Sequence, residues 1–263
     1  MGSRSMLWPE YVQYILLANS RHGTHSPFVY EFADRVLYKK YDHPMFYDIE
    51  LIRQRMLQSK AEIEVTDWGA AGNNGSVYLK PISKMVARAA KSSKYAKLLY
   101  RICAYYRPTY AIELGTNFGI STLYQLAGSM PGHFITIEGC KNTAEIARYN
   151  FSKLNLEQSV HSLIGTFDQV LPGVVEQVPR VDYAFVDGNH RKDPTLRYFE
   201  MLLPKLHNES IVIFDDIRWS KEMREAWEEI KQHERVRVSI DLFFMGIVFL
   251  RQEQTKEHFT LRF

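Results

Sequence analysis

The second half of the chain alternates short apolar runs with stretches in which apolar residues recur every three or four positions. The apolar runs predict strands, and the periodic stretches predict amphipathic helices between them. The predicted strands are YAIEL (110–114), FITIE (134–138), VHSLIG (160–165), YAFVD (183–187) and IVIFD (211–215). Because these strands are apolar along nearly their whole length, we expect a mostly parallel sheet with helices on both faces. The later segments RVRVSIDL and FFMGIVFLRQ predict a terminal hairpin.

The first part of the chain has a helical pattern. Apolar residues stand at helical spacing in LWPEYVQYILLANS, SPFVYEFADRVLYKK and MFYDIELIRQRMLQ. Ser26 followed by Pro27 predicts the N-cap and first turn of a helix. A further helical stretch runs from Ile82 until Pro108 closes it. We therefore expect three parts: residues 1–5, which resemble an expression tag, a helical extension with a rim loop over 6–80, and the main domain over 81–263.

Two glycine-rich segments compete for the role of a ligand-binding turn, one at 64–76 and one at 111–122. A nucleotide site at a strand end needs an apolar strand, glycines in the turn, a helix that begins at once and an acid at the end of the next strand. The segment 111–122 meets all four requirements, since Glu138 ends the next strand. The first segment has a half-charged strand, is followed by Pro81 and lacks the later acid. We therefore interpret Asp67–Gly75 as a turn at the rim, with a role as a lid left open.

The spacing of the second turn disfavours a dinucleotide ligand. A dinucleotide fingerprint reads GxGxxG, whereas this turn reads Glu113-x-Gly115-x-x-x-Gly119, with Asn117 in place of the second glycine. A carboxylate beside the turn repels a pyrophosphate and suits a cationic ligand that carries an amino acid. These properties point to S-adenosylmethionine, whose sulfonium and ammonium groups are both positive.

The amino-acid composition mainly excludes classes of protein and kinds of site. The 263 residues are 46% apolar and 24% charged, which is typical of a globular protein with one large domain. A net charge of +3 gives no case for nucleic acid, and no apolar run is long enough to span a bilayer. Cys103 and Cys140 are isolated, so we expect neither a zinc site nor a disulfide, and a cytoplasmic location fits best. His22 and His25 have no acid or cysteine nearby, and we interpret them as structural.

The stretch from about Ser92 to Phe249 resembles the class I S-adenosylmethionine-dependent methyltransferases, within them the catechol and caffeoyl-CoA O-methyltransferase-like branch. The segments that carry the resemblance are KYAKLLYRICAYYRPTYAIELGTNFGIS, ITIEGCKNTAEIA, IGTFDQVLP, FVDGNH and IFDDIRW. The segments HSPFVY and DWGA are reminiscent of bacterial methyltransferase-like proteins. The resemblance implies a doubly wound, Rossmann-like α/β fold with a mostly parallel seven-stranded sheet. It also implies an enzyme that methylates a hydroxyl of a small molecule.

By position, the resemblance implies nine cofactor-binding residues at the ends of the first three strands of the main domain. They are Glu113, Gly115, Asn117, Gly119, Ser121, Glu138, Gly165, Thr166 and Phe167. Ser121 would reach the methionine carboxylate, where the free amides of a helix start also favour an anion. Glu138 would accept both ribose hydroxyls. The adenine would be lined by Gly165, Thr166 and Phe167.

The same resemblance implies a divalent cation and a catalytic group at the ends of the fourth and fifth strands. The metal ligands would be Asp187, Asp215 and Asp216, and oxygen ligands of this kind suit magnesium, manganese or calcium. The catalytic residues would be Asp187 and His190. The chain departs from the branch in two places, since Asp216 stands where Asn is usual and His190 where Lys is frequent. A histidine there can act as a general base near neutral pH, and the presence of the metal stays open.

Three other functions remain open beside O-methylation. They are a nicotinamide oxidoreductase, which the missing GxGxxG disfavours, a metal-independent methyltransferase acting on another atom, and a non-catalytic protein with the same fold. We interpret Arg191, Lys192 and Arg218 as solvated surface residues, with contact to an anionic substrate as the alternative. Trp219 is either an aromatic wall for the acceptor or a core residue. The expected partner is a small-molecule acceptor, with a homodimer left open and neither nucleic acid nor membrane expected.

Overall fold

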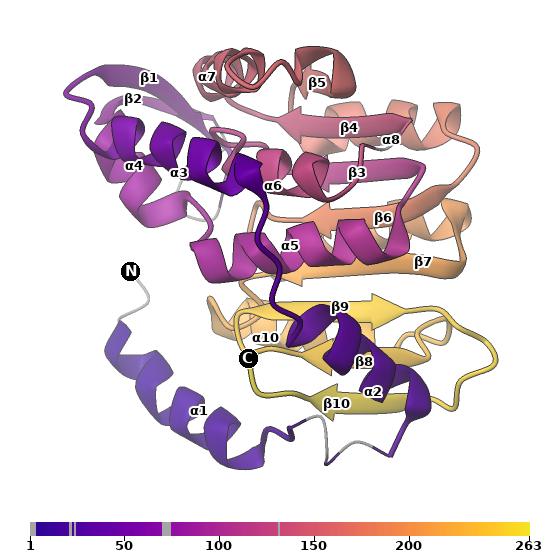
Figure 1. Ribbon diagram of the computed structural model, residues 1–263. Helices are drawn as coiled ribbons and strands as arrows, with labels where there is room; N and C mark the ends of the chain where they lie inside the picture. Colours follow the sequence, from indigo (N-terminus) through magenta and orange to yellow (C-terminus); the bar gives the residue numbers. More distant parts are fainter. Residues whose placement is uncertain (1–3, 21–22, 24, 70–74, 131) are drawn as a thin grey trace. The chain divides into compact units, whose positions relative to one another are not determined.

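The fold is α/β, as the sequence predicts. The computed structural model describes residues 4–20, 23, 25–69, 75–130 and 132–263 (Figure 1). The strands of this described part form a two-stranded antiparallel sheet and a mostly parallel sheet of eight strands, one more than the seven expected. The chain divides into two compact units, residues 39–174 and residues 1–38 together with 175–263.

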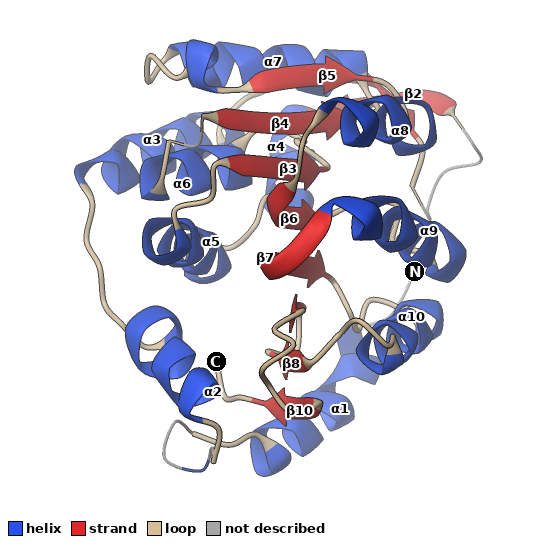
Figure 2. Cartoon of the chain, turned by 90° about the vertical axis from the view of Figure 1, so that its right-hand side faces the viewer, coloured by secondary structure: helices blue, strands red, loops and turns tan. Residues whose placement is uncertain are grey.

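Three parallel strands form the centre of the unit 39–174. They are β3 (Tyr110–Leu114), β4 (His133–Glu138) and β5 (His161–Ile164), with Ile112 opposite Ile135. The helices that follow or precede them are α5 (Ser93–Tyr106), α6 (Ile120–Gly128), α7 (Lys141–Ser152) and α8 (Phe167–Gln177), with a short 3-10 turn at Glu157–Ser159. Figure 2 shows α5 and α6 on one face of these strands and α8 on the other. The two covered faces explain why β3 is apolar or buried almost throughout.

The same unit begins with a helix and a hairpin. Its elements are α3 (Pro44–Leu57), β1 (Glu62–Asp67), β2 (Ser76–Pro81) and α4 (Ile82–Ala89). β1 and β2 pair antiparallel, with Asp67 opposite Ser76. The rim turn predicted at Asp67–Gly75 therefore joins these two strands, and its residues 70–74 lie outside the described residues.

The helical stretch predicted to run from Ile82 to Pro108 is interrupted. Ala90 and Ser92 both have extended backbone, with ψ of 125° and 147°, and they separate α4 from α5. The residues between the two helices are Ala, Lys and Ser, which are compatible with a helix, so the sequence pattern gave no sign of the break.

The second unit carries the remaining strands in the order β10-β8-β9-β7-β6. They are β6 (Val181–Val186), β7 (Leu206–Asp215), β8 (Val238–Asp241), β9 (Met245–Phe249) and β10 (Glu257–Thr260). β8 and β9 pair antiparallel, which confirms the predicted terminal hairpin. β10 is the strand that the prediction missed, and it pairs in parallel with β8. The helices α9 (Lys192–Leu202) and α10 (Lys221–Gln232) lie on one face, with a 3-10 turn at Leu203–Lys205 (Figure 2).

The N-terminal helices belong to this second unit. They are α1 (Arg4–Leu17) and α2 (Pro27–Phe32), which continues into a π-helical turn at Ala33–Leu37. Ser26 caps α2 by accepting the backbone N–H of Val29, and Pro27 is its first residue, as predicted. Phe28 and Phe32 contact Phe249 of β9 edge to face. No helix in the described part of the chain has both the length and the apolar character that a bilayer span requires.

Gly119 gives a test of how the turn before α6 is built. Its φ is 78°, and a Cβ at this position would lie 2.4 Å from Cε1 of Phe151. We expect Gly119→Ala to lower the free energy of unfolding by about 2–4 kcal/mol, because it adds both backbone strain and overlap. Urea unfolding measures the change.

Gly173→Ala is the matched control. Gly173 lies inside α8, and no atom lies within 4 Å of an added Cβ. The control should leave stability unchanged or raise it by up to about 1 kcal/mol. Equal losses in the two variants would contradict the account of Gly119.

Candidate functional site

A tight turn joins the end of β3 to the start of α6. Gly115, Asn117 and Gly119 all have left-handed backbone, with φ of 102°, 49° and 78°. The N–H of Gly115 donates to the carbonyl of Ile137 at 2.9 Å, which fixes the turn against the end of β4. α6 begins directly at Ile120. The first amides of a helix have no partner within the helix, so this turn offers donors to an anionic group.

Asn117 places an unused acceptor in this turn. Its backbone N–H donates to Oε2 of Glu138 at 2.8 Å. Its side-chain Oδ1 is buried and has no hydrogen-bond partner. Because a buried acceptor without a donor costs free energy, an ammonium or hydroxyl group of a bound ligand would stabilise this position.

Glu138, the last residue of β4, is tied to both neighbouring loops. Oε2 accepts from Asn117, and Oε1 accepts the N–H of Cys140 at 2.9 Å. Burial raises the pKa of Glu138, and the backbone N–H groups of Cys140 and Asn117 act in the opposite direction. The side chain of Thr143 and the backbone of Gly139 also hydrogen-bond to this carboxylate. The carboxylate is therefore fixed in orientation at the end of β4.

The turn after β5 lies directly beside Glu138. The N–H of Gly165 donates to the carbonyl of Glu138 at 2.9 Å, and Gly165 has a φ of 151°. Thr166 precedes α8, and Phe167 is its first residue. The structure thus brings Gly165, the first of the three predicted adenine-lining residues, next to the predicted ribose acid at the carboxyl ends of β4 and β5.

Glu113 is placed differently from the other predicted cofactor residues. Its side chain is completely buried, and its carboxylate accepts hydrogen bonds from Ser121, Thr122, Gln125 and Thr136. These contacts join β3 to α6 and β4. The Ser121 hydroxyl, predicted to reach a methionine carboxylate, donates to Glu113 at 2.8 Å instead. Burial raises the pKa of Glu113 to about 7, although the four donors lower it.

In the second unit, His190 lies between two carboxylates. Its Nε2 is 3.9 Å from Oδ1 of Asp187 and 3.9 Å from Oδ2 of Asp216. Asp187 follows β6 and Asp216 follows β7, so both acids stand just after the carboxyl ends of neighbouring parallel strands. The structure therefore places the imidazole between two acidic side chains.

The backbone around His190 is strained. Asn189, His190 and Asp216 have φ of 66°, 46° and 52°, a region that costs a non-glycine residue of the order of 1 kcal/mol or more. Asn189 is held by two side-chain contacts, since its Nδ2 donates to the Tyr198 hydroxyl at 3.0 Å and its Oδ1 accepts from Nε of Arg191 at 2.8 Å. Strained residues of this kind persist where surrounding contacts enforce them, often at functional sites.

The three predicted metal ligands differ in their exposure. Asp215 is buried, at 1% exposure, whereas Asp187 and Asp216 are partly exposed and flank His190. Among the residues that the structure describes, no group of three His, Cys, Asp or Glu side chains is arranged to hold a metal ion. His25 is exposed, and His22 lies outside the described residues. The metal site stays a prediction.

Two of the basic residues that follow the acids form ion pairs. Arg218 is not a solvated surface residue, because its guanidinium makes a bidentate pair with Asp241 at 2.6 and 2.7 Å. Lys192 pairs with Glu229 of α10 at 2.5 Å. Trp219 is 42% exposed, and its ring centroid lies 6.0 Å from that of His190. Of the two alternatives for Trp219, the structure favours an aromatic wall beside the histidine.

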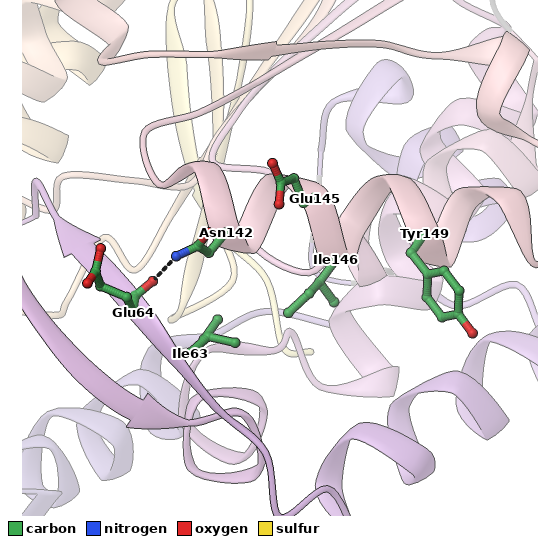
Figure 3. Close-up of a pocket in the computed structure, with 6 residues that line it drawn as sticks. All are labelled: Ile63, Glu64, Asn142, Glu145, Ile146 and Tyr149. Atoms are coloured by element: carbon green, nitrogen blue, oxygen red, sulfur yellow. Dashed lines mark hydrogen bonds between the residues drawn. The ribbon is translucent and has the colours of Figure 1, made fainter.

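An open groove of about 420 Å³ lies between α7 and β1, away from these residues. It is lined by Ile63, Glu64, Asn142, Glu145, Ile146 and Tyr149 (Figure 3). Asn142 Nδ2 donates to the carbonyl of Glu64 at 2.7 Å and so joins the strand to the helix. None of the predicted site residues lines this groove.

The central part of the chain is similar to known methyltransferases in sequence. Residues 112–217 match the family model described as a methyltransferase domain. Catechol O-methyltransferase of Mycobacterium tuberculosis is 24% identical over 131 residues. This match covers 49% of this chain and 58% of the relative, so the chain spans somewhat more than half the length of that relative.

Solved structures show the same fold. A Podospora anserina methyltransferase bound to S-adenosylhomocysteine superposes with a TM-score of 0.60 at 16% identity, covering 87% of this chain and 99% of that chain. The O-methyltransferase from Bacillus cereus, also in complex with S-adenosylhomocysteine, has a TM-score of 0.57 at 19% identity, covering 84% and 97%. The predicted resemblance to the class I methyltransferases is confirmed at the level of the fold.

Glu113 predicts a pH-dependent part of the stability. Between its ordinary pKa of 4.5 and the raised value of about 7, the folded chain keeps a proton that the unfolded chain has released. The contribution of this group is therefore fully present below about pH 4.5. As the pH rises to about 7, this contribution to the free energy of unfolding falls by about 3 kcal/mol.

Urea unfolding of wild type and Glu113→Gln between about pH 5 and pH 8 measures this contribution. The stability of wild type relative to the variant should fall across this range. Glu145→Gln, an exposed carboxylate on α7, is the control and should run parallel to wild type. A constant difference between wild type and Glu113→Gln would exclude a titrating Glu113.

Proposed function

We propose that this chain, whose residues 112–217 match a methyltransferase domain, transfers a methyl group from S-adenosylmethionine to a hydroxyl of a small molecule. The observation that carries the proposal is the geometry of Glu138. Two backbone N–H groups orient its carboxylate at the end of β4, beside a left-handed turn and a helix start. An acidic side chain at the end of the second strand is the group that binds ribose hydroxyls in nucleotide sites of this architecture.

The residues around Glu138 fit the rest of the cofactor. The buried Oδ1 of Asn117 can accept from the ammonium of the methionine part. The first amides of α6 can donate to its carboxylate. Gly165, Thr166 and Phe167 stand next to Glu138, where the adenine would lie. When bound, the cofactor supplies a methyl group already activated by a positive sulfur, so the protein has to align the acceptor and take up its proton.

We assign the proton acceptor to His190. An imidazole that takes the proton of the acceptor hydroxyl becomes positive, and Asp187 and Asp216 then lie within 3.9 Å of that charge. The left-handed backbone at Asn189 and His190 holds the ring in this place. The exposed face of Trp219 beside it is suited to an aromatic or planar acceptor.

A metal-assisted route is the alternative, as the resemblance to the catechol and caffeoyl-CoA O-methyltransferase-like branch implies. In that route Asp187, Asp215 and Asp216 would hold a divalent cation, and the cation would lower the pKa of the acceptor hydroxyl. The two routes differ in what they require of His190, since only the first needs a neutral imidazole that gains a proton.

Calorimetric titration with S-adenosylhomocysteine tests the cofactor assignment. We expect wild type to bind it and not to bind NAD. Glu138→Gln should weaken binding by about 1–3 kcal/mol, because the variant loses the charge and one acceptor oxygen. Glu145→Gln, a carboxylate on the neighbouring helix, should bind like wild type. Absence of binding by wild type would refute the proposal, and equal affinity of Glu138→Gln would refute the role of Glu138.

Methylation of catechol, used as a probe acceptor, tests the role of His190. Because a glutamine side chain cannot take up the proton of the acceptor hydroxyl, we expect His190→Gln to lower kcat by about 10²–10³. His207→Gln is the control, since His207 forms another histidine–aspartate pair, with Asp182 at 2.8 Å, at the opposite ends of β6 and β7. Activity abolished by a chelator and restored by magnesium would favour the metal-assisted route instead.

A further inference from the structure

The β1–β2 hairpin is attached to the loop that carries the ribose acid. Asn142, at the start of α7, donates to the carbonyl of Glu64 at 2.7 Å (Figure 3). At the end of β1, Nε1 of Trp68 donates to the carbonyl of Gly139 at 3.1 Å. Gly139 directly follows Glu138, so the indole is anchored one residue away from the carboxylate assigned to the ribose.

Two glycines fix the position of this indole. A Cβ at Gly139 would lie 2.6 Å from Cδ1 of Trp68, and a Cβ at Gly75 would lie 3.0 Å from its Cη2. Gly75 has a φ of 96°, so both its backbone and its missing side chain serve this contact. The ring is therefore held at its N–H and along its edges, which leaves it little freedom to rotate.

Part of the Trp68 side chain is nevertheless exposed to solvent. Trp68 is 39% exposed, although its N–H is already bonded and its edges are packed. A large aromatic side chain immobilised in this way offers a preformed contact for a planar or sugar group at little cost in entropy. Stacking of a nucleobase on an aromatic side chain contributes about 1–3 kcal/mol.

We propose that Trp68 contacts the adenosine part of the cofactor and forms a wall of its site beside Glu138. The inference rests on the proposed function, because it takes the ligand to be an adenosyl compound held by Glu138. It assigns a binding role to the β1–β2 hairpin, which lies outside the methyltransferase-domain match at 112–217. The first glycine-rich segment of the sequence then serves the same ligand as the second, through an aromatic side chain.

Titration of Trp68→Ala and Trp68→Phe with S-adenosylhomocysteine and with adenosine tests this role. We expect Trp68→Ala to lower the affinity for both ligands about tenfold or more, and Trp68→Phe, which keeps a ring but loses the N–H, to stay within about threefold of wild type. Adenosine should change the tryptophan fluorescence of wild type but not that of Trp68→Phe at saturation. Leu79→Ala, at an exposed position of the same hairpin, is the control and should bind like wild type.

The outcomes separate the two proposals. If wild type binds neither ligand, the proposed function fails. If wild type binds both ligands and Trp68→Ala binds within about twofold of it, only the contact with Trp68 is refuted. Equal large losses in Trp68→Ala and Trp68→Phe would show that the hydrogen bond to Gly139 positions the loop, and this result would also overturn direct contact.

Discussion

The Glu138 carboxylate is the interaction on which the candidate site depends. By accepting from Asn117 on one side and Cys140 on the other, it joins the turn after β3 to the loop after β4. The carbonyl of Glu138 in turn receives the N–H of Gly165, and the next carbonyl receives the indole N–H of Trp68. One residue thus sets the relative positions of three loops, and those loops contain most of the predicted cofactor residues.

In each compact unit, neighbouring contacts stabilise a group whose conformation or burial is unfavourable. In residues 39–174 the feature is the buried Glu113, which four donors from α6 and β4 surround. In the other unit it is the left-handed backbone at Asn189, His190 and Asp216. The first feature joins secondary structure elements, whereas the second brings a histidine to two carboxylates. The buried carboxylate therefore has a structural role in one unit, whereas the strained backbone positions candidate site residues in the other.

The sequence predicted the elements well where one local pattern determined them. The strand YAIEL coincides with β3, and Ser26 caps α2 as expected. The sequence could not show how deeply Glu113 is buried, because an acid inside a strand can point to a ligand or to a helix. It also could not show that Arg218 meets Asp241, since that pair depends on how the chain folds back before β9. β10 is short and half polar, so it resembled a loop. The division at residue 80, the metal site and the homodimer stay predictions.

The packing of Trp68 has a consequence for how related sequences can vary. Its indole fills the room that Gly75 and Gly139 leave by having no side chain. A side chain at either glycine requires a smaller residue at 68, and a smaller residue at 68 leaves a void beside the loop of Glu138. The side-chain sizes at these three positions therefore depend on one another, and a substitution at one of them is tolerated only when another position changes as well. Covariation of 68, 75 and 139 would be the evolutionary trace of that constraint.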